Sequence, residues 1–353
     1  MSFARASESV RRKADHVKIA LEEEVEFASL TTGLKRYKLV YEALPEIDLN
    51  EVDLSTTLLG KHLQMPLIIS PITGGTPDAA RINRVLAEAA QQFGLAMGVG
   101  SQRVALEEPD VAYSFQVRKE TPDILLFANL GAIQLNNDHG LEGCRKAVEM
   151  IDADALMLHL NPLQECVQWH GNTNFRNLAS QIATVCDGLE YPVVAKEVGH
   201  GISARSAKLL AEAGVVGIDV AGAGGTSWAK VESFRDKSSA LSSLGTAMGE
   251  WGIPTAESLL AVKESAPMVT TIASGGIRTG TDIAKCLALG ADAVGMGLPL
   301  LRCAASSAEA LHEKLALLRE ELSVVMMCVG CRNVAELRNR GPAVLKTDIS
   351  NPS

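Results

Sequence analysis

Short apolar runs rich in β-branched residues alternate along the chain with longer segments in which apolar residues recur at helical spacing. The alternation begins at Pro66 and is typical of repeated βα units around a parallel sheet. About eight runs are present, the number that closes an α/β fold of the (β/α)8, or TIM, barrel class. The predicted strands are Pro66–Ser70, Leu95–Val99, Ile124–Ala128, Ala155–His159, Val193–Glu197, Val215–Val220, Val269–Ala273 and Ala293–Met296.

The helix predicted after the first strand has clear start and stop signals. Thr76 can cap its N-terminus, Pro77 occupies the first helical position, and Gly94 follows the last residue with helical periodicity. Further helices are predicted at Leu141–Ile151, Phe175–Cys186, Ala204–Ala213, Thr255–Glu264, Thr281–Leu289 and Ala308–Val325. We therefore expect one barrel domain over residues 66–353.

Two features depart from a minimal barrel. Residues 1–65 are expected to form an extension with a charged helix at about Ser9–Glu24. After the sixth strand, the stretch between Ala221 and Pro254 is longer than the usual βα connection, so we expect a long loop there. Long loops inside a compact domain usually carry function.

Composition and charge narrow the class of protein. A content of 47% hydrophobic and 21% charged residues excludes disordered and disulfide-scaffold proteins. The net charge of −9 disfavours nucleic acid as a partner. The N-terminus lacks the apolar core of a signal peptide, and no apolar run is long enough to span a membrane. The 7 cysteines lack framework spacing, which indicates reduced thiols, so we expect a cytoplasmic protein.

Cys328-Val-Gly-Cys331 resembles a metal or redox motif in isolation. No second Cys or His pair lies nearby at metal-ligand spacing, and the motif ends a predicted apolar helix. Packing is therefore the favoured interpretation.

In a barrel of this class the residues just after each strand build the active site. Glycines follow the seventh and eighth predicted strands, in Ser274-Gly275-Gly276-Ile277-Arg278 and Gly295-Met296-Gly297. Such glycines let backbone N–H groups approach a phosphate, although they also serve in simple tight turns. Because both clusters follow the strands at which barrels bind phosphate, we favour a phosphate site.

Lys196 lies inside an otherwise apolar predicted strand, where an unpaired charge is costly. One interpretation is a structural ion pair with a neighbouring carboxylate. The other is a cation beside a flavin, where it would stabilise the anionic reduced form.

His159 and Asn161 share one face of a predicted strand end, with Gln164 and Glu165 just beyond it. A single histidine there is often an ordinary barrel residue. Glu165 could bind Mg²⁺, which prefers one or two carboxylates together with substrate phosphates.

Basic residues cluster near the N-terminus of this acidic protein. They could be a solvated helix face, the commoner case. If the extension folds over the barrel mouth, Arg12, Lys13 and Arg103 could instead clamp a second anion. Trp228 and Glu232, four residues apart, could likewise lie on a surface turn or over the mouth.

Several motifs together resemble the type 2 isopentenyl diphosphate isomerases, from about Ser9 to Pro342. They are R-K-A-D-H at 12–16, T-G-G at 73–75, G-S-Q-R at 100–103, N-L-G at 129–131, H-L-N-P-L-Q-E at 159–165, K-E-V-G-H-G at 196–201, D-V-A-G-A-G-G-T-S-W at 219–228 and S-G-G-I-R-T-G at 274–280. The family usually has Met before T-G-G, where this chain has Ile72. Both side chains are apolar and of similar size, so a backbone contact there should survive.

The resemblance implies a homo-oligomer, a tetramer or octamer, that uses reduced FMN and Mg²⁺ to interconvert isopentenyl diphosphate and dimethylallyl diphosphate, with NAD(P)H as reductant. It implies a metal contact at Glu165 and catalytic roles for Gln164, Glu232 and His159, with N5 of FMN as the main proton shuttle. The implied substrate-binding residues are Arg12, Lys13, Ser101, Gln102, Arg103, His159, Asn161 and Gln164. The implied FMN-binding residues are Pro71, Ile72, Thr73, Gly74, Ser101, Asn129, Lys196, Thr226, Gly275, Gly276, Arg278, Gly297 and Leu298.

Two alternatives remain open. Residues 274–294 also resemble FMN-dependent 2-hydroxy acid oxidases and dehydrogenases, which need a base and a carboxylate clamp after the sixth strand. Here Gly222-Ala223-Gly224-Gly225 offers neither His nor Arg. The other alternative is a flavin-binding barrel without catalysis.

Overall fold

The computed structural model describes residues 7–137, 139–235 and 240–347. Within these ranges, parallel strands close a barrel in the order β10-β11-β4-β5-β6-β7-β8-β9, which confirms the predicted fold. Pairing of β11 with β4, which places Val294 opposite Leu67, completes the circle. The barrel strands are β4 (Leu67–Ile69), β5 (Ala96–Gly98), β6 (Leu126–Gly131), β7 (Ala155–Leu160), β8 (Val193–Glu197), β9 (Gly217–Asp219), β10 (Thr270–Ser274) and β11 (Ala293–Met296).

Alternate strand residues fill the barrel interior, as strand geometry requires. Phe127, Met157 and Ile272 belong to one buried cluster with Leu58 and Leu63. The two leucines come from a hairpin formed by β2 (Thr56–Leu58) and β3 (Lys61–Leu63). The hairpin therefore packs onto the interior cluster, while the residues that follow the strands form a pocket at the other end.

The predicted helices pack outside the barrel, with ends within a few residues of the expected ones. Thr76 caps α2 by accepting a hydrogen bond from the Ala79 N–H at 3.1 Å, and Gly94 ends it with φ +60°. The surrounding helices are α2 (Pro77–Phe93), α4 (Gly140–Ile151), α6 (Leu178–Gly188), α7 (Ala204–Glu212), α10 (Thr255–Ser265), α11 (Gly280–Ala288), α12 (Leu298–Ser306) and α13 (Ala308–Cys328). Shorter elements are α3 (Arg103–Glu107), α5 (Pro162–Val167), α14 (Val334–Asn339), α15 (Gly341–Val344) and the 3-10 helices Leu34–Arg36, Leu49–Glu51, Pro109–Ser114 and Ala132–Asn136.

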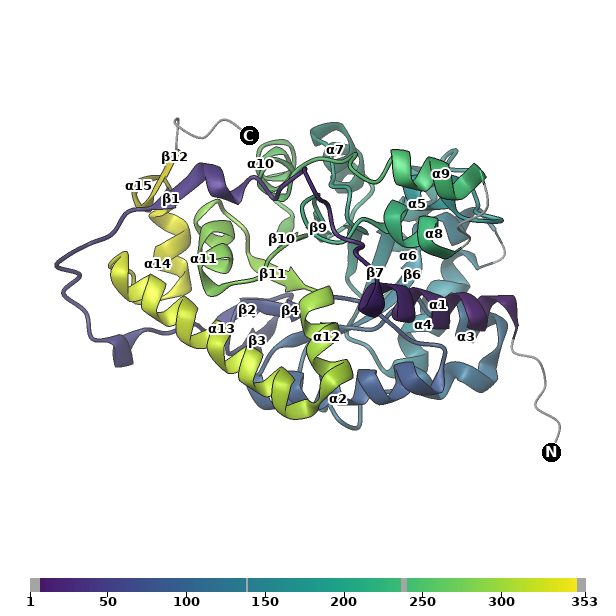
Figure 1. Ribbon diagram of the computed structural model, residues 1–353, viewed down its shortest axis with the longest axis horizontal. Coiled ribbons are helices and arrows are strands. Elements are labelled where there is room, and N and C mark those ends of the chain that lie inside the picture. The colour runs from purple at the N-terminus through teal and green to yellow at the C-terminus, as the bar shows by residue number, and fades with distance from the viewer. Residues whose placement is uncertain (1–6, 138, 236–239, 348–353) are drawn as a thin grey trace.

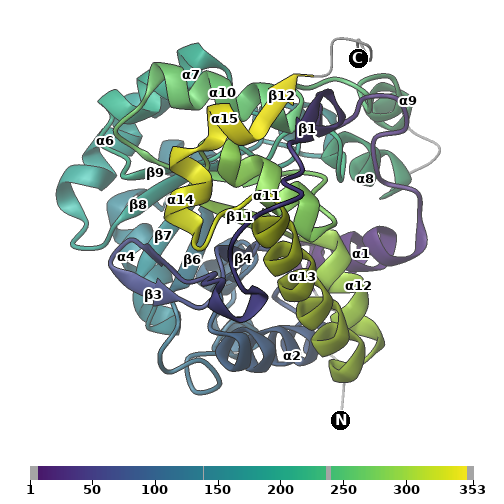
Figure 2. The same cartoon turned by 90° about the vertical axis from the view of Figure 1, so that its left-hand side faces the viewer.

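Besides the β2–β3 hairpin, a helix and a strand of the N-terminal extension also contact the rest of the fold. Helix α1 (Glu8–Glu22) packs against α8 (Trp228–Arg235), as Figure 1 shows. Strand β1 (Tyr37–Leu39) pairs antiparallel with β12 (Leu345–Thr347), so the extension forms a small sheet with the C-terminal segment (Figure 2).

The long connection after β9 is more ordered than the loop we expected, because it contains α8 and α9 (Ala240–Ala247). Helix α8 places Trp228 at the pocket and the buried Glu232 beside the pocket-lining Gln164. Among the helices in the described ranges, none combines the length and apolar character needed to cross a membrane.

Candidate active site

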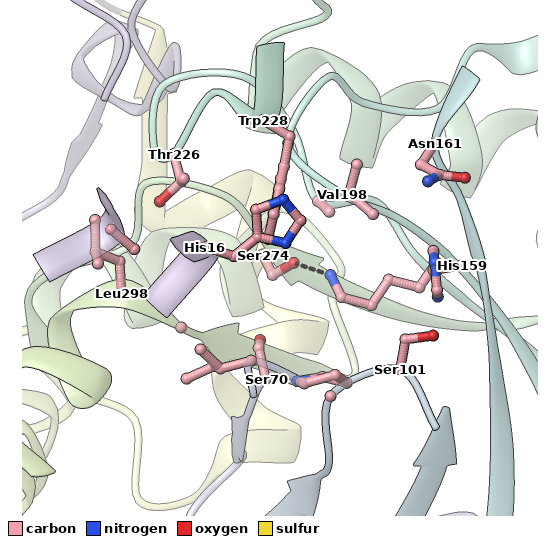
Figure 3. A pocket seen from close by; sticks show the side chains of 18 of the residues that line it. His16, Ser70, Ser101, His159, Asn161, Val198, Thr226, Trp228, Ser274 and Leu298 are labelled. Carbon is pink, nitrogen blue, oxygen red and sulfur yellow. Dashed lines mark hydrogen bonds between the residues drawn. The ribbon is translucent and has the colours of Figure 1, made fainter. Parts of the chain in front are cut away.

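A pocket lies where the barrel strands end. Every barrel strand contributes to it through its last residues or the loop that follows, and α1, α5 and α8 complete the wall. In Figure 3, His16 and Trp228 lie above side chains such as Ser101 and Ser274 that come from the strand ends. The extension therefore contributes to the wall at the barrel mouth, which was the less common of the two interpretations of its basic cluster.

Most of the residues predicted for a site line this pocket. They are Arg12, Lys13, Pro71, Ile72, Ser101, Arg103, Asn129, His159, Asn161, Gln164, Glu165, Lys196, Thr226, Gly275, Gly276, Arg278, Gly297 and Leu298. Glu232 lies directly behind the wall, hydrogen-bonded to Gln164.

The structure places Gln102 elsewhere. Its side chain is fully buried and donates from Nε2 to the Ala147 carbonyl at 2.7 Å. Its Oε1 accepts from the Asn129 N–H at 2.9 Å. Because both ends of the amide have partners in the wall, Gln102 supports the site from behind instead of contacting substrate through its side chain.

Thr73 and Gly74 also lie outside the pocket lining. Thr73 is buried, and a Cβ on Gly74 would lie 1.9 Å from the Phe115 ring. Of the residues predicted after β4 to bind FMN, Pro71 and Ile72 therefore line the pocket, whereas Thr73 and Gly74 lie just beyond its lining.

The pocket is rich in cations although the protein is acidic. Five Lys and Arg side chains line it, against two carboxylates, those of Glu26 and Glu165. Burial, together with Arg12 and Arg103, lowers the pKa of Lys13 to about 7. Burial and the charge of Arg103 also lower the pKa of Arg12. These cations destabilise one another, and an anionic ligand would relieve that repulsion.

A buried carboxylate links the extension to the barrel. Glu232 Oε1 accepts hydrogen bonds from Gln164 Nε2 and interacts with His16 Nε2, both at 2.9 Å, while Arg235 donates to Oε2 at 3.2 Å. Burial opposes its ionisation, but the contacts with His16, Gln164 and Arg235 outweigh burial and lower its pKa to about 2. Glu232 is therefore ionised at neutral pH. In its best-satisfied orientation, the Gln168 amide also donates to Glu232 and accepts from Arg12.

Glu165 and Asn161 form an oxygen-rich corner. Asn161 Nδ2 donates to Glu165 Oε1 at 2.9 Å and to Gln164 Oε1 at 3.1 Å, and the Asn172 N–H donates to Glu165 Oε2 at 2.6 Å. Asn161 Oδ1 is buried and has no hydrogen-bond partner within the described residues. One carboxylate beside an unpartnered amide oxygen fits Mg²⁺, which takes oxygen ligands and shares its shell with phosphates. No cluster of three or more acidic, His or Cys ligands occurs in the described ranges.

His159 is held as a neutral ring. Asn129 Nδ2 donates to the Val99 carbonyl at 3.1 Å, so its Oδ1 faces His159 Nδ1 at 2.9 Å and accepts a hydrogen bond from the Nδ1–H group. Burial, together with the nearby Lys13 and Lys196, lowers the pKa of His159 to about 3. In the ligand-free protein, Nε2 is thus a hydrogen-bond acceptor.

The glycines after β10 allow the loop that follows β9 to pack closely against them, with their own backbone at the pocket wall. Gly275 and Gly276 have φ of +104° and +72°, and a Cβ on either would approach backbone atoms within 2.3 Å. Arg278, which follows them, pairs with Glu26 of the extension. Ser70 lines the same region, and its Oγ is buried without a hydrogen-bond partner in the described chain. A flavin nucleotide fits this donor set, because its phosphate and ring can use the backbone, Arg278 and Ser70.

Comparison with known proteins agrees with this geometry. The family model described as FMN-dependent dehydrogenase matches residues 6–116 and 144–343. The isopentenyl-diphosphate delta-isomerase of Nostoc sp. is 51% identical over 336 residues, covering 95% of this chain and 96% of the relative. That of Synechococcus sp. is 50% identical over 343 residues, covering 97% and 99%. The chain belongs to the FMN-dependent isopentenyl-diphosphate delta-isomerases.

Members of this isomerase family share their fold with flavin oxidases and dehydrogenases of 2-hydroxy acids. A solved (S)-mandelate dehydrogenase mutant superposes with a TM-score of 0.66 at 19% identity, covering 96% of each chain. At that identity the likeness concerns the fold alone.

Several residues of the isomerase pocket had no predicted role. His16, Ser70, Gln168, Asp219 and Ser274 all lie in the wall or directly behind it. His16 belongs to the quoted R-K-A-D-H motif, and Asp219 begins another motif, so their positions carried a signal. His16 meets Glu232 and Ser274 meets Asp219 across long separations in sequence, and only the folded barrel brings these pairs together.

Proposed function

We propose that this pocket interconverts isopentenyl diphosphate and dimethylallyl diphosphate with reduced FMN and Mg²⁺. The observation that supports it best is the pairing of two separate anion-binding regions in one pocket. Arg12, Lys13 and Arg103 form one beside Glu165, while the glycines before Arg278 form the other. A substrate diphosphate and a cofactor phosphate would each need such a region.

FMN would be held by the glycine turn after β10, by Arg278 and by Ser70, with Lys196 beside its ring. When bound and reduced, FMN would supply an electron-rich, dry ring surface and an exchangeable proton. Pro71, Ile72, Ser101, Asn129, Thr226, Gly297 and Leu298 would complete this part of the pocket.

The substrate diphosphate would be bound by Arg12, Lys13 and Arg103, with Mg²⁺ between it and Glu165. Ser101, His159 and Asn161 line the same part of the pocket. His159 presents an acceptor nitrogen there, so it would contact a protonated group or take up a proton when the anion binds. Binding by the arm would also exclude water from the hydrocarbon tail.

The reaction adds a proton to one end of an alkene and removes one from the allylic carbon. Gln164 would orient the allylic end, because its amide is fixed by Asn161 on one side and Glu232 on the other. Glu232 is ionised, so it would act as a base or stabilise positive charge in the transition state; it cannot begin as the acid.

Further aspects of the proposal concern the cellular setting. NAD(P)H would reduce the flavin, and the protein would act in the cytoplasm as a tetramer or octamer. Residues 1–65 would work as an extension of the domain at 66–353, because the substrate-binding arm has a function only over the barrel mouth.

The test is a side-by-side assay of the purified, FMN-loaded protein with labelled isopentenyl diphosphate. Dimethylallyl diphosphate should form only when the flavin is reduced and Mg²⁺ is present. Glu142 is exposed, so a Glu142→Gln variant serves as a control for the loss of one carboxylate and should form product at the rate of the unmodified protein. If no product forms and 2-hydroxy acids bleach the oxidised flavin instead, the hydroxy acid oxidase function replaces this proposal.

A further inference from the structure

Lys196 lines the pocket, but its charge is shared with residues behind it. Its Nζ lies 3.1 Å from Asp219 Oδ2 and donates to Ser274 Oγ at 3.4 Å, the contact drawn as a dashed line in Figure 3. Ser274 Oγ in turn donates to Asp219 Oδ1 at 2.5 Å. The three side chains form a closed triangle. Lys196 therefore has a carboxylate partner, as one interpretation of the sequence expected, and it also lines the pocket, where the other interpretation places a flavin.

The barrel strands place these residues side by side. Lys196 on β8 is the direct register partner of Asp219 on β9. The Asp219 side chain is 1% exposed and does not belong to the pocket lining, whereas Lys196 and Ser274 do. Asp219 also accepts from the Ala221 N–H at 3.3 Å. Asp219 can therefore affect a ligand only indirectly, by its contact with Lys196 or by the electric field of its carboxylate.

A lone ammonium beside a flavin would favour the reduced, electron-rich form and hold its electrons tightly. A carboxylate 3.1 Å behind that ammonium cancels most of its field at longer range, because opposite unit charges at that spacing act as a dipole. The pair then presents a hydrogen-bond donor to the pocket with little net charge.

We propose that Asp219 is a positioning residue that compensates the charge of Lys196, so that reduced FMN remains electron-rich enough to take part in alkene protonation. This inference rests on the proposed function, since it places the flavin beside Lys196. Without the carboxylate, the flavin is easier to reduce but supports isomerisation less well. A carboxylate with a merely structural role would not produce these opposite changes.

The experiment uses the FMN-loaded protein and the variants Asp219→Asn, Lys196→Gln and the double variant. The asparagine keeps a hydrogen-bond partner for Ser274, whose hydroxyl can donate or accept. The oxidised–reduced equilibrium is measured against a redox dye, FMN dissociation is measured separately, and turnover of labelled isopentenyl diphosphate is followed with fully reduced protein. Asp154→Asn, which removes a paired carboxylate before β7 at the opposite end of the barrel, is the matched control.

For Asp219→Asn we expect at least a tenfold shift toward reduced flavin, about 30 mV for a two-electron couple, with isomerisation slowed roughly tenfold or more. Lys196→Gln should shift the equilibrium the other way. The double variant, which restores neutrality, should return to within about threefold of the unmodified protein. Asp154→Asn should change neither quantity.

The proposal is overturned if Asp219→Asn leaves the equilibrium unchanged or shifts it toward oxidised flavin. If that single variant does not fold, comparison of Lys196→Gln with the double variant still isolates the Asp219 charge, and equal equilibria in those two proteins also overturn it. Failure of the proposed function looks different, since the unmodified protein would then bind FMN without converting isopentenyl diphosphate.

Discussion

Lys13 gives the sharpest test of how the extension binds an anion. Its ammonium lies beside two guanidinium groups, and burial together with Arg12 and Arg103 lowers its pKa to about 7. A bound diphosphate would favour the charged form and raise that pKa again. Binding above pH 7 must therefore take up a proton, and affinity must fall as the pH rises.

The size of the effect follows from the fraction of free protein with charged Lys13. That fraction is about one half at pH 7 and about one hundredth at pH 9, so affinity should fall about 50-fold between these values. At pH 8, binding should take up about 0.9 proton at this residue.

Calorimetry with isopentenyl diphosphate measures both the affinity and the proton uptake. The protein is used in its oxidised, FMN-loaded form, which should bind the ligand without converting it. Buffers with different ionisation enthalpies report the proton uptake. Lys13→Arg is the matched control, since arginine stays charged throughout this range. Ionisation of the ligand affects both proteins equally, so the ratio of their affinities isolates Lys13. Parallel pH profiles for the two proteins, with equal proton uptake, would refute the reasoning.

Three further variants test other parts of the site. Gly276→Ala should destabilise the protein by roughly 2 kcal/mol or more in urea unfolding and weaken FMN binding, because the new Cβ would lie 2.3 Å from the Gly224 carbonyl oxygen at φ +72°. The control Gly60→Ala, at φ +82° in open space, should lower the free energy of unfolding by only about 1 kcal/mol. Glu165→Gln should raise the Mg²⁺ concentration for half-maximal activity roughly tenfold or more and leave the FMN affinity unchanged. An unchanged Mg²⁺ titration would show that Glu165 does not bind the metal. His16→Ala should lower kcat/KM roughly tenfold, because it removes the contact of His16 with the ionised Glu232. His16→Gln should recover part of the loss, and equal losses in both variants would argue against a role for the His16–Glu232 hydrogen bond.

The barrel could be predicted because each of its units carries local signals. Thr76, Pro77 and Gly94 mark the ends of α2, and the apolar runs mark the strands within a few residues. The boundary at α6 was less accurate: the helix begins at Leu178 instead of Phe175, after Asn177 adopts a left-handed conformation that the apolar pattern does not encode.

Membership of the pocket could be predicted for residues at or just beyond the end of a strand, such as Lys196, His159 and Glu165. Gln102 could not be placed in this way. It belongs to a recognisable motif, yet its side-chain amide is hydrogen-bonded to the backbone of Ala147 and Asn129 in the wall. Motif membership does not reveal on which side of the wall a side chain lies. That depends on the turn after β5 and on its packing against α4.

The proposed reaction is an allylic proton shift, and incorporation of solvent deuterium into the product tests it most directly. Reduced, Mg²⁺-supplied protein is incubated with ¹³C-labelled isopentenyl diphosphate in D₂O, and the product is followed by NMR. The expected product is dimethylallyl diphosphate with deuterium in a methyl group, because the added proton comes from an exchangeable site. No product, or product that carries no solvent deuterium, would contradict it.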